Sequence, residues 1–149
     1  MFPFLPWCHP DYELSETRQW LTSILPDWED GKSYGFAIIR KSDERYLGGI
    51  GLNQIDENPV VNLGYWIRSS ATGQGIATEA TRALAAFGLT RLQKIRVEII
   101  MSVENEASRK VAENAGAKYE GILRNRLLLH GRCHDAHSYS ILRSDLNLI

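Results

Sequence analysis

Residues 60–80 read VVNLGYWIRSSATGQGIATEA and contain the clearest structural signals of the chain. Its first part, residues 60–67, is rich in β-branched and aromatic side chains, which is typical of a strand. A polar loop that contains glycine follows over residues 68–75. Apolar side chains then recur at helical spacing over residues 76–89. The stretch therefore predicts a strand, a glycine-containing loop and a helix in direct succession.

The rest of the chain extends this unit on both sides. A helix is predicted from Ser15 to Leu25, with Ser15 as its cap and Pro26 as its end. Turn-rich segments separate three consecutive strands that end at residue 67, which predicts an antiparallel meander. The other predicted elements are strands over 34–40, 46–53 and 94–101, a helix over 106–115 that Gly116 ends, a strand over 119–129, a turn at 130–132 and a last strand over 137–142. This order indicates a mixed α/β (α+β) fold.

The composition predicts a single globular domain over residues 1–149. Hydrophobic residues make up 44% and charged residues 23% of the chain, which excludes a disordered protein. The formal net charge is −1, so no basic excess favours general binding to nucleic acid. No apolar run approaches the roughly 20 residues of a membrane span, and the N-terminus lacks the pattern of a signal peptide. The two cysteines, Cys8 and Cys133, make no disulfide framework, which favours a reducing, cytoplasmic location.

The loop over residues 68–75 has the features of a phosphate-binding turn. Backbone N–H groups at a helix start lack internal partners, and the helix dipole places partial positive charge there. Gly73 and Gly75 would let a pyrophosphate approach this backbone closely, and Arg68 could add a charge-assisted contact. The alternative is an ordinary helix-entry loop that uses glycine for its turn. A Walker loop and a dinucleotide fingerprint are excluded, because Gly-Lys-Ser/Thr and a third glycine are missing.

Several blocks of the sequence resemble a known family. Residues 64–67 (GYWI) followed by 72–80 (TGQGIATEA) look like the acetyl-CoA motif of the GCN5-related N-acetyltransferase (GNAT) superfamily. Residues 105–117 (NEASRKVAENAGA) resemble the next helix of that superfamily. The tail, residues 120–124 (EGILR) and 130–135 (HGRCHD), resembles the ribosomal-protein N-terminal acetyltransferases of the RimJ/RimL type. The resemblance covers nearly the whole chain.

The resemblance implies a GNAT fold, in which a mixed, mostly antiparallel twisted sheet splays at the acetyl-CoA site and is flanked by helices. In this superfamily pantetheine lies between the two splayed strands, and a backbone N–H near Trp66 or Ile67 polarises the thioester carbonyl. Acetyl-CoA is then the co-substrate, and its acetyl group moves directly to a primary amine without a metal. The cofactor-binding residues that the resemblance implies are Trp66, Ile67, Arg68, Thr72, Gly73, Gln74, Gly75, Ile76, Ala77, Thr78, Asn105 and Ser108.

The chain departs from the family pattern in the loop and at its beginning. Ser70 stands where the superfamily has Arg or Gln. Because backbone groups make most of the phosphate contacts, we expect binding to survive this change. The family also begins with a strand and a helix ahead of the segment that starts here. Their absence would leave one edge of the sheet bare or mean that the chain is incomplete, and a second subunit in a homodimer could cover such an edge.

Asn105 and Ser108 lie three residues apart at a predicted helix start and therefore on one face of that helix. In the resembled family these positions contact pantetheine, and the serine is the candidate to donate a hydrogen bond to the departing thiolate. Ser108 is therefore the first catalytic candidate. The alternative is that Asn105 is an ordinary N-cap and that Ser108 supports the same turn. Asn105 could fill both roles.

The pattern marks no single residue as the general base. Some related enzymes carry a glutamate at the position of Leu127, and many carry one just before Gly64, where this chain has Asn62 and Leu63. Glu98 lies on the predicted central strand, shares a sheet with the acetyl-CoA site and is the second catalytic candidate. Its alternative role is that of a surface or ion-paired strand residue. Loss of the amine proton to ordered water would require no base.

Residues 130–137 contain three histidines, a cysteine and an aspartate, which are residue types that bind zinc. Neighbouring strand residues point to opposite faces, so we expect no metal site here. Asp135 is instead expected to make a structural hydrogen bond near the mouth of the acceptor site. The aromatic residues that could line an acceptor pocket, with core packing as the alternative for each, are Trp7, Trp20, Trp28, Tyr34 and Tyr65.

Three functions are compatible with these patterns. The leading hypothesis is an acetyl-CoA-dependent N-acetyltransferase that acts on a primary amine, with a protein N-terminal α-amine as the expected acceptor. The second is acetylation of a small-molecule amine on the same scaffold. The third is a catalytically silent acyl-CoA-binding module, which the missing glutamates at 62 and 127 motivate. Neither nucleic acid nor a membrane is an expected partner.

Overall fold

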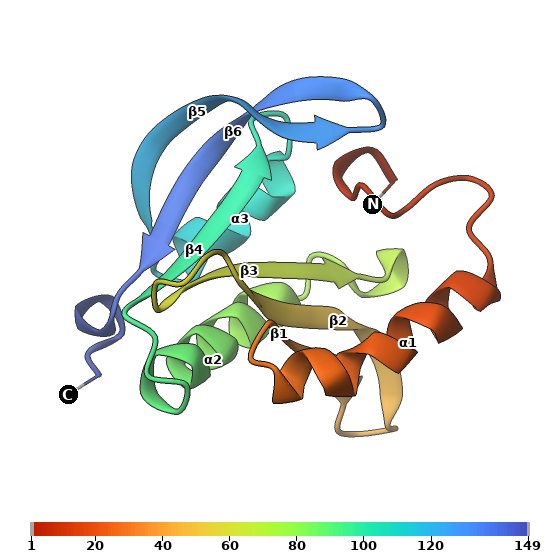
Figure 1. The fold of residues 1–149 in the computed structure, drawn as a ribbon, viewed down its shortest axis with the longest axis horizontal. Coiled ribbons are helices and arrows are strands. Elements are labelled where there is room, and N and C mark those ends of the chain that lie inside the picture. Colours follow the sequence, from red (N-terminus) through yellow and green to blue (C-terminus); the bar gives the residue numbers. More distant parts are fainter. Residues whose placement is uncertain (1, 149) are drawn as a thin grey trace.

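The computed structural model describes residues 2–148, in which six strands form one sheet (Figure 1). The strands lie in the order β1-β2-β3-β4-β6-β5, so β1 forms one edge of the sheet. The β3–β4 pair is parallel, and the other neighbouring pairs are antiparallel. The strands are β1 (Ser33–Arg40), β2 (Arg45–Gln54), β3 (Val60–Ile67), β4 (Arg96–Ser102), β5 (Lys118–Leu129) and β6 (Arg132–Ile141). The predicted mixed, mostly antiparallel sheet and its antiparallel meander are confirmed.

Three α-helices accompany the sheet in the described part of the chain: α1 (Leu14–Glu29), α2 (Ile76–Thr90) and α3 (Glu106–Asn114). Helix α2 follows β3 through the glycine-containing loop, as predicted. Helix α3 ends next to Gly116, whose φ of 91° suits the left-handed turn that closes a helix. Within residues 2–148 no helix combines the length and the apolar character needed to cross a membrane.

The hydrophobic core lies between the sheet and helices α2 and α3. Because strand residues alternate between the two faces, β3 points Val61 and Leu63 into this core, and Leu84 of α2 packs with them. Burial of apolar surface contributes roughly 25 cal/mol per Å² and is the main stabilising term. The intervening positions of β3, which include Asn62 and Trp66, consequently lie on the opposite face of the sheet.

Helix α1 differs from its prediction at both ends. It starts after Glu13 rather than at Ser15, because the Glu16 carboxylate accepts a hydrogen bond from the Glu13 N–H at 2.9 Å and so completes the helix start. Pro26 does not end the helix, which continues for another turn. That turn carries Trp28, whose ring packs edge-on against two aromatic residues of β1. This packing offsets the helical hydrogen bond that a proline cannot donate.

Strands β5 and β6 form a long hairpin that arches over one end of the molecule (Figure 1). The predicted turn is confirmed at His130 and Gly131, whose φ values of 48° and 79° suit a two-residue hairpin turn. Strand β6 starts at Arg132 rather than at His137, which corrects the prediction. The tight turn places Arg132 directly opposite Leu129, so pairing begins immediately after it.

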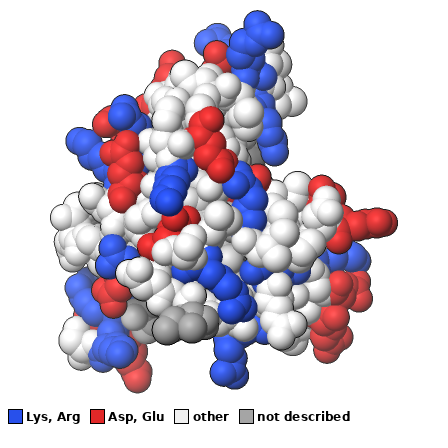
Figure 2. Space-filling model, turned by 90° about the vertical axis from the view of Figure 1, so that its left-hand side faces the viewer, with Lys and Arg blue, Asp and Glu red and all other residues white. Residues whose placement is uncertain are grey.

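Charge is mixed on the face of the molecule that Figure 2 shows. Lys and Arg side chains are interspersed there with Asp and Glu side chains, and among the described residues in that view no broad area carries one sign of charge. General binding to nucleic acid depends on a basic patch or stripe. This face therefore does not favour such a function.

Strands β3 and β4 separate along their length. Their pairing stops at Asn62 and Glu98. Residues 63–67 of β3 and 99–102 of β4 continue without pairing to each other, and Figure 1 shows the two ribbons diverging. The sheet is thus continuous at one end of this pair and open at the other, in agreement with the predicted splay.

Candidate functional site

The candidate site lies where β3 and β4 separate and where helices α2 and α3 begin. Beyond Asn62, the edge of β3 that faces β4 has no strand partner within the described chain. An unpaired strand edge can hydrogen-bond an extended ligand in the way that a neighbouring strand would. Trp66 and Ile67, the residues predicted to lie beside the reacting carbonyl, stand at the end of this edge.

The loop between β3 and α2 holds an open, left-handed backbone. Gly73 has a φ of 74° and Gly75 a φ of 77°, values that glycine adopts without the strain that a Cβ would bring. A Cβ built on either glycine would have no described atom within 4 Å, so there is space outside both residues. Among residues 2–148 no side chain caps the start of α2 at Ile76. The N–H groups of this first turn can therefore bind an anion at the positive end of the helix dipole.

Side chains of the loop brace its backbone without covering it. Thr72 donates a hydrogen bond from Oγ1 to the carbonyl oxygen three residues before it, at 2.9 Å. Gln74 Nε2 donates one to the carbonyl oxygen of Ser70 at 3.4 Å. Arg68 donates from Nη1 to a carbonyl oxygen of β2 at 3.1 Å, so its guanidinium is held at the start of the loop. The predicted contact of Arg68 with phosphate stays a prediction.

A groove continues from this loop along one face of α2. Its volume is about 560 Å³, and it lies between α2 and the end of α3. Arg82 joins the two helices there by donating from Nη2 to the carbonyl oxygen of Asn114 at 2.8 Å. Sequence reasoning missed this groove, although its α2 residues recur at helical spacing and thus share a face. The lining residues are Gly75, Thr78, Glu79, Arg82, Ala83, Ala86 and Asn114.

Helix α3 begins with a side-chain cap. Asn105 Oδ1 accepts a hydrogen bond from the Ser108 N–H at 3.1 Å, which makes Asn105 the N-cap. The N-cap interpretation of Asn105 is therefore confirmed, and its contact with a cofactor stays a prediction. The capped turn fixes the backbone of Ser108, whose side chain is half-buried.

Tyr65 of β3 connects the strand to this capped turn. Its hydroxyl donates a hydrogen bond to Ser108 Oγ at 3.1 Å, although 43 residues separate the two. Burial raises the pKa of the Tyr65 phenol, so the hydroxyl keeps the proton that it donates. Sequence reasoning considered Tyr65 only as a pocket or core aromatic. The available signal was its hydroxyl on the core-facing side of a strand, where a phenol needs a hydrogen-bond partner.

Glu98 lies at the closed end of the opening, where the pairing of β3 and β4 stops. Its carboxylate accepts a hydrogen bond from Arg96 Nε at 2.9 Å, and Arg96 also pairs with Glu120. The ion-pair interpretation of Glu98 is confirmed, and its action as a base stays a prediction. Asn62, its register partner on β3, has a buried Oδ1 that lacks a hydrogen-bond partner among the described residues.

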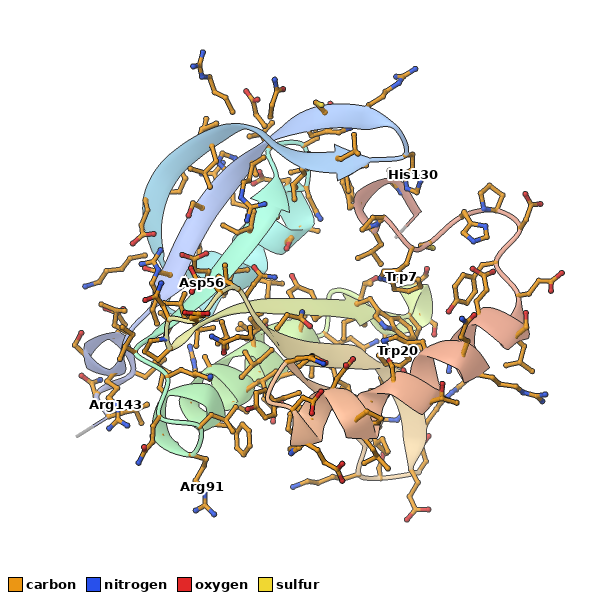
Figure 3. The ribbon with its side chains drawn as sticks, viewed as in Figure 1. Trp7, Trp20, Asp56, Arg91, His130 and Arg143 are labelled. Atoms are coloured by element: carbon orange, nitrogen blue, oxygen red, sulfur yellow. The ribbon has the colours of Figure 1, made fainter. Side chains whose placement is uncertain are left out.

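An aromatic cluster lies at the open end of β3. The ring of Trp66 is 6.2 Å from that of Trp7 and 5.6 Å from that of Tyr46, both in edge-on contacts. Trp7 also contacts Tyr12 and is 43% exposed. Figure 3 shows Trp7 on the same side of the molecule as His130 at the β5–β6 turn. The N-terminal segment, which carries Trp7, therefore meets β3 beside the opening.

The histidine-rich hairpin is not organised as a metal site. Within residues 2–148 no three His, Cys, Asp or Glu side chains come together as possible metal ligands. His134 Nδ1 lies 3.4 Å from a carboxylate oxygen of Glu104, whereas His137 lies edge-on to a tyrosine of β5. Asp135 Oδ1 accepts a hydrogen bond from the Asn125 N–H at 2.8 Å. The predicted structural hydrogen bond of Asp135 is thereby confirmed.

The structure arranges the sequence-predicted residues in separate groups. Residues 72–78 surround the start of α2, Ser108 lies in the first turn of α3, and Glu98 lies apart from both at the closed end of the opening. Two of the aromatic residues considered for the acceptor pocket, Trp28 and Tyr34, pack against each other with ring centroids 5.1 Å apart. For that pair, the alternative of structural packing is the correct one.

The comparison with protein families identifies the class of this chain. The family model of the acetyltransferase (GNAT) domain matches residues 1–118, which include the opening, the loop and both helix starts. The chain belongs to this family and is an acetyltransferase. The resemblance stated from the sequence blocks is confirmed.

Several individual acetyltransferases are similar to this chain in sequence or structure. YdaF of Bacillus subtilis (strain 168) is 35% identical over 128 residues, which cover 83% of this chain and 69% of YdaF. The ribosomal-protein-serine acetyltransferase of Escherichia coli (strain K12) is 33% identical over 104 residues, which cover 69% of this chain and 58% of that protein. A solved structure of RimL, a ribosomal L7/L12 alpha-N-protein acetyltransferase in complex with coenzyme A, is similar with a TM-score of 0.84 and 26% identity. That similarity covers 94% of this chain and 78% of RimL.

Proposed function

We propose that this chain acts as one catalytic domain and transfers an acetyl group from acetyl-CoA to the N-terminal α-amine of a protein. The observation that carries the proposal is the opening between β3 and β4, beside which lie the uncapped start of α2 and the Ser108 hydroxyl. Similarity to RimL and to the E. coli ribosomal-protein-serine acetyltransferase supports a protein amine as the acceptor.

The residues at the start of α2 fit the phosphate end of acetyl-CoA. Open space outside Gly73 and Gly75 admits a bulky anion, and the first-turn N–H groups provide its hydrogen-bond donors. The groove beside Arg82 offers room for the nucleotide part. Acetyl-CoA, when bound, supplies the acetyl group as a thioester.

The chain's own residues polarise the reacting groups. In this proposal a backbone N–H at Trp66 or Ile67 donates to the carbonyl oxygen, where negative charge develops as the amine attacks. Ser108 donates a hydrogen bond to the sulfur. Ordered water takes the proton of the amine and can pass it on toward Glu98, which lies at the closed end of the opening. Direct transfer of the acetyl group needs no acyl-enzyme intermediate, so no catalytic role is proposed for the free cysteines Cys8 and Cys133. Free thiols agree with a cytoplasmic location, which we also propose.

The acceptor is proposed to enter on the face of the sheet that carries Trp66. This face is opposite to the core and to α2, and the partly exposed ring of Trp7 borders it. A peptide N-terminus arrives as an ammonium group, which the faces of tryptophan and tyrosine rings attract. The aromatic cluster would therefore hold the acceptor next to the end of β3.

An acetylation assay tests the acceptor class. The purified protein is incubated with acetyl-CoA and a lysine-containing peptide with a free N-terminus, and thiol release is followed with a thiol reagent. The matched control is the same peptide with a formylated N-terminus, and small amines form a third set. We expect thiol release with the free peptide alone, and mass spectrometry should place the acetyl group on its α-amine.

The other outcomes of this assay point to different functions. Reaction with small amines and none at peptide N-termini would contradict the protein acceptor and support a small-molecule enzyme. Binding of acetyl-CoA without thiol release for any amine would indicate a silent acyl-CoA-binding module. Each result therefore separates one of the three hypotheses from the other two.

A further inference from the structure

The hydrogen bond between Tyr65 and Ser108 has no role in the function proposed so far. It joins the middle of β3 to the first turn of α3, with the phenol as donor and Ser108 Oγ as acceptor at 3.1 Å. Neither side chain is exposed. The pair lies on the core-facing side of β3, next to the part of the strand that has no β4 partner. It therefore borders the opening rather than a distant part of the core.

The hydrogen bonds of Ser108 do not use its hydroxyl proton. The Ser108 N–H is taken by Asn105 Oδ1 at 3.1 Å, and one lone pair of Ser108 Oγ is taken by Tyr65. A serine hydroxyl has one proton and two acceptor lone pairs. Within residues 2–148 no group accepts the Ser108 hydroxyl proton. That proton remains available to a ligand in the opening.

Tyr65 acts as a donor over the range of pH in which the enzyme would work. Burial raises the pKa of its phenol, so the hydroxyl keeps its proton where a thiol, with an ordinary pKa of about 8.5, begins to ionise. A hydroxyl that accepts one hydrogen bond becomes a stronger donor of the next, because the bonds polarise one another. Tyr65 thus strengthens whatever hydrogen bond Ser108 makes.

We propose that Tyr65 is a positioning residue, which directs the Ser108 hydroxyl proton toward the sulfur of CoA and strengthens the hydrogen bond to the leaving thiolate. The inference rests on the proposed function. As the amine nitrogen bonds to the acetyl carbon, the carbon–sulfur bond breaks and its electron pair stays on sulfur. The amine proton goes to ordered water, which can pass it on toward Glu98. The protons of Ser108 and Tyr65 stay on their own oxygens and disperse the negative charge of the sulfur.

The direct test is the thiol pKa of CoA bound to the protein, measured by the ultraviolet absorbance of the thiolate. The complex with desulfo-CoA, which lacks the sulfur, supplies the baseline for the protein's own cysteines and tyrosines. In the wild type we expect this pKa to lie about one unit below that of free CoA, the size expected for one charge-assisted hydrogen bond. Ser108→Ala should restore the value of free CoA, and Tyr65→Phe should restore about half of the shift.

Two further variants separate positioning from structure. Ser108→Thr keeps a hydroxyl and should keep the lowered thiol pKa. Tyr139 is a matched control, because it is buried and bonds the other end of α3, through Glu113 at 2.9 Å. Tyr139→Phe should therefore leave the thiol pKa of bound CoA unchanged. A merely structural role for Tyr65 would make the two phenylalanine variants behave alike.

Kinetics give a second readout. Tyr65→Phe should lower kcat about tenfold with the KM for acetyl-CoA unchanged, and the double variant Tyr65→Phe/Ser108→Ala should be no slower than Ser108→Ala. Equal thiol pKa values in wild type and Tyr65→Phe, or losses that multiply in the double variant, would overturn the inference alone. Failure of the wild type to bind CoA would overturn the proposed function, and the inference with it.

Discussion

Helices α2 and α3 both begin beside the opening in the sheet, but their first turns are completed in different ways. Helix α2 follows Gly75, and within the described chain no side chain caps it. Helix α3 follows Asn105, whose side chain accepts the N–H of Ser108. Because Gly75 has no side chain to cap α2, the N–H groups of the first turn of α2 are free to bind a ligand. In α3, by contrast, Asn105 accepts the N–H of Ser108, which fixes the position of the Ser108 side chain.

The packing of the two helices explains how one of them can lack a cap. An N-cap typically contributes about 1 kcal/mol to stability. Helix α2 has 15 residues and buries several of them, among them Leu84 and Leu89, so its packing offsets the missing cap. Helix α3 has 9 residues, of which Ala112 is the buried one, and depends more on its cap. Helix α2, which is held by its packing, can therefore bind an anion at its N-terminus. The shorter helix α3 instead uses its cap to hold Ser108 in place.

Closing the open start of α2 should have the largest effect. Gly73→Glu places a carboxylate and a Cβ at a φ of 74°, and we expect a loss of more than about 100-fold in CoA affinity, measured by calorimetry. Gly131→Glu is the matched control, because it puts the same charge at a φ of 79° in the β5–β6 turn. It should bind CoA as the wild type does. Unchanged affinity in Gly73→Glu would mean that this start holds no phosphate.

A change at the aromatic cluster should affect neither helix start. Trp7→Ala removes the exposed ring beside Trp66, and we expect the KM for a peptide acceptor to rise about tenfold with CoA affinity unchanged. Trp20→Ala, on α1, is the control, because Trp20 is 52% exposed and lies outside the cluster. Steady-state kinetics and calorimetry measure the two quantities. Weaker CoA binding in Trp7→Ala would show that the cluster serves the cofactor.

Replacing Glu98, at the closed end of the opening, should lower activity less than the two changes above. A general base typically contributes 10²–10⁴-fold. Because Arg96 holds the Glu98 carboxylate and water can take the proton, we expect Glu98→Gln to lower kcat by less than about tenfold. A pH–rate profile makes the distinction. A loss above about 100-fold, together with a flattened acid limb, would identify Glu98 as the base and contradict this expectation.

Removing the N-cap of α3 should lower the stability of the protein and its turnover more than its binding of acetyl-CoA. Asn105→Ala removes the cap, and we expect the free energy of unfolding to fall by about 1 kcal/mol in a urea titration. The KM for acetyl-CoA should change little, whereas kcat should fall because Ser108 is less well held. If CoA affinity falls as much as kcat, Asn105 contacts the cofactor directly.

Adding a positive charge to the open start should have the smallest effect. Ser70→Arg restores the residue type of the family pattern beside an exposed loop, and we expect CoA to bind about threefold more tightly at low salt. Because the charge is exposed, the gain should fade at high ionic strength. Calorimetric titrations at two salt concentrations measure it. A gain that persists at high salt would point to a buried contact instead.

The sequence predicted the regions whose structure depends on local signals. The strand, glycine loop and helix over residues 60–89 follow one another along the chain, and their periodicity and turn residues are local properties. The cap at Asn105 and the helix end at Gly116 were also predictable, because each depends on residues within one turn.

Contacts between elements that are distant in the sequence explain where the structure differs from the predictions made from the sequence. Pro26 does not end α1, because Trp28 packs against β1 and holds the next turn. The bond from Tyr65 to Ser108 joins residues 43 positions apart and depends on how α3 sits against β3. Periodicity along one segment does not contain that information. The same reason explains why the groove between α2 and α3 became visible only in the structure.

The open start of α2 and the split sheet are together expected to bind acetyl-CoA. Calorimetric titration of the purified protein with acetyl-CoA and, separately, with free CoA tests this expectation most directly. We predict micromolar binding of both ligands with one site per chain, and its loss in Gly73→Glu but not in Gly131→Glu. Absence of binding to the wild-type protein at millimolar ligand would mean that the start of α2 and the split sheet do not form an acetyl-CoA site.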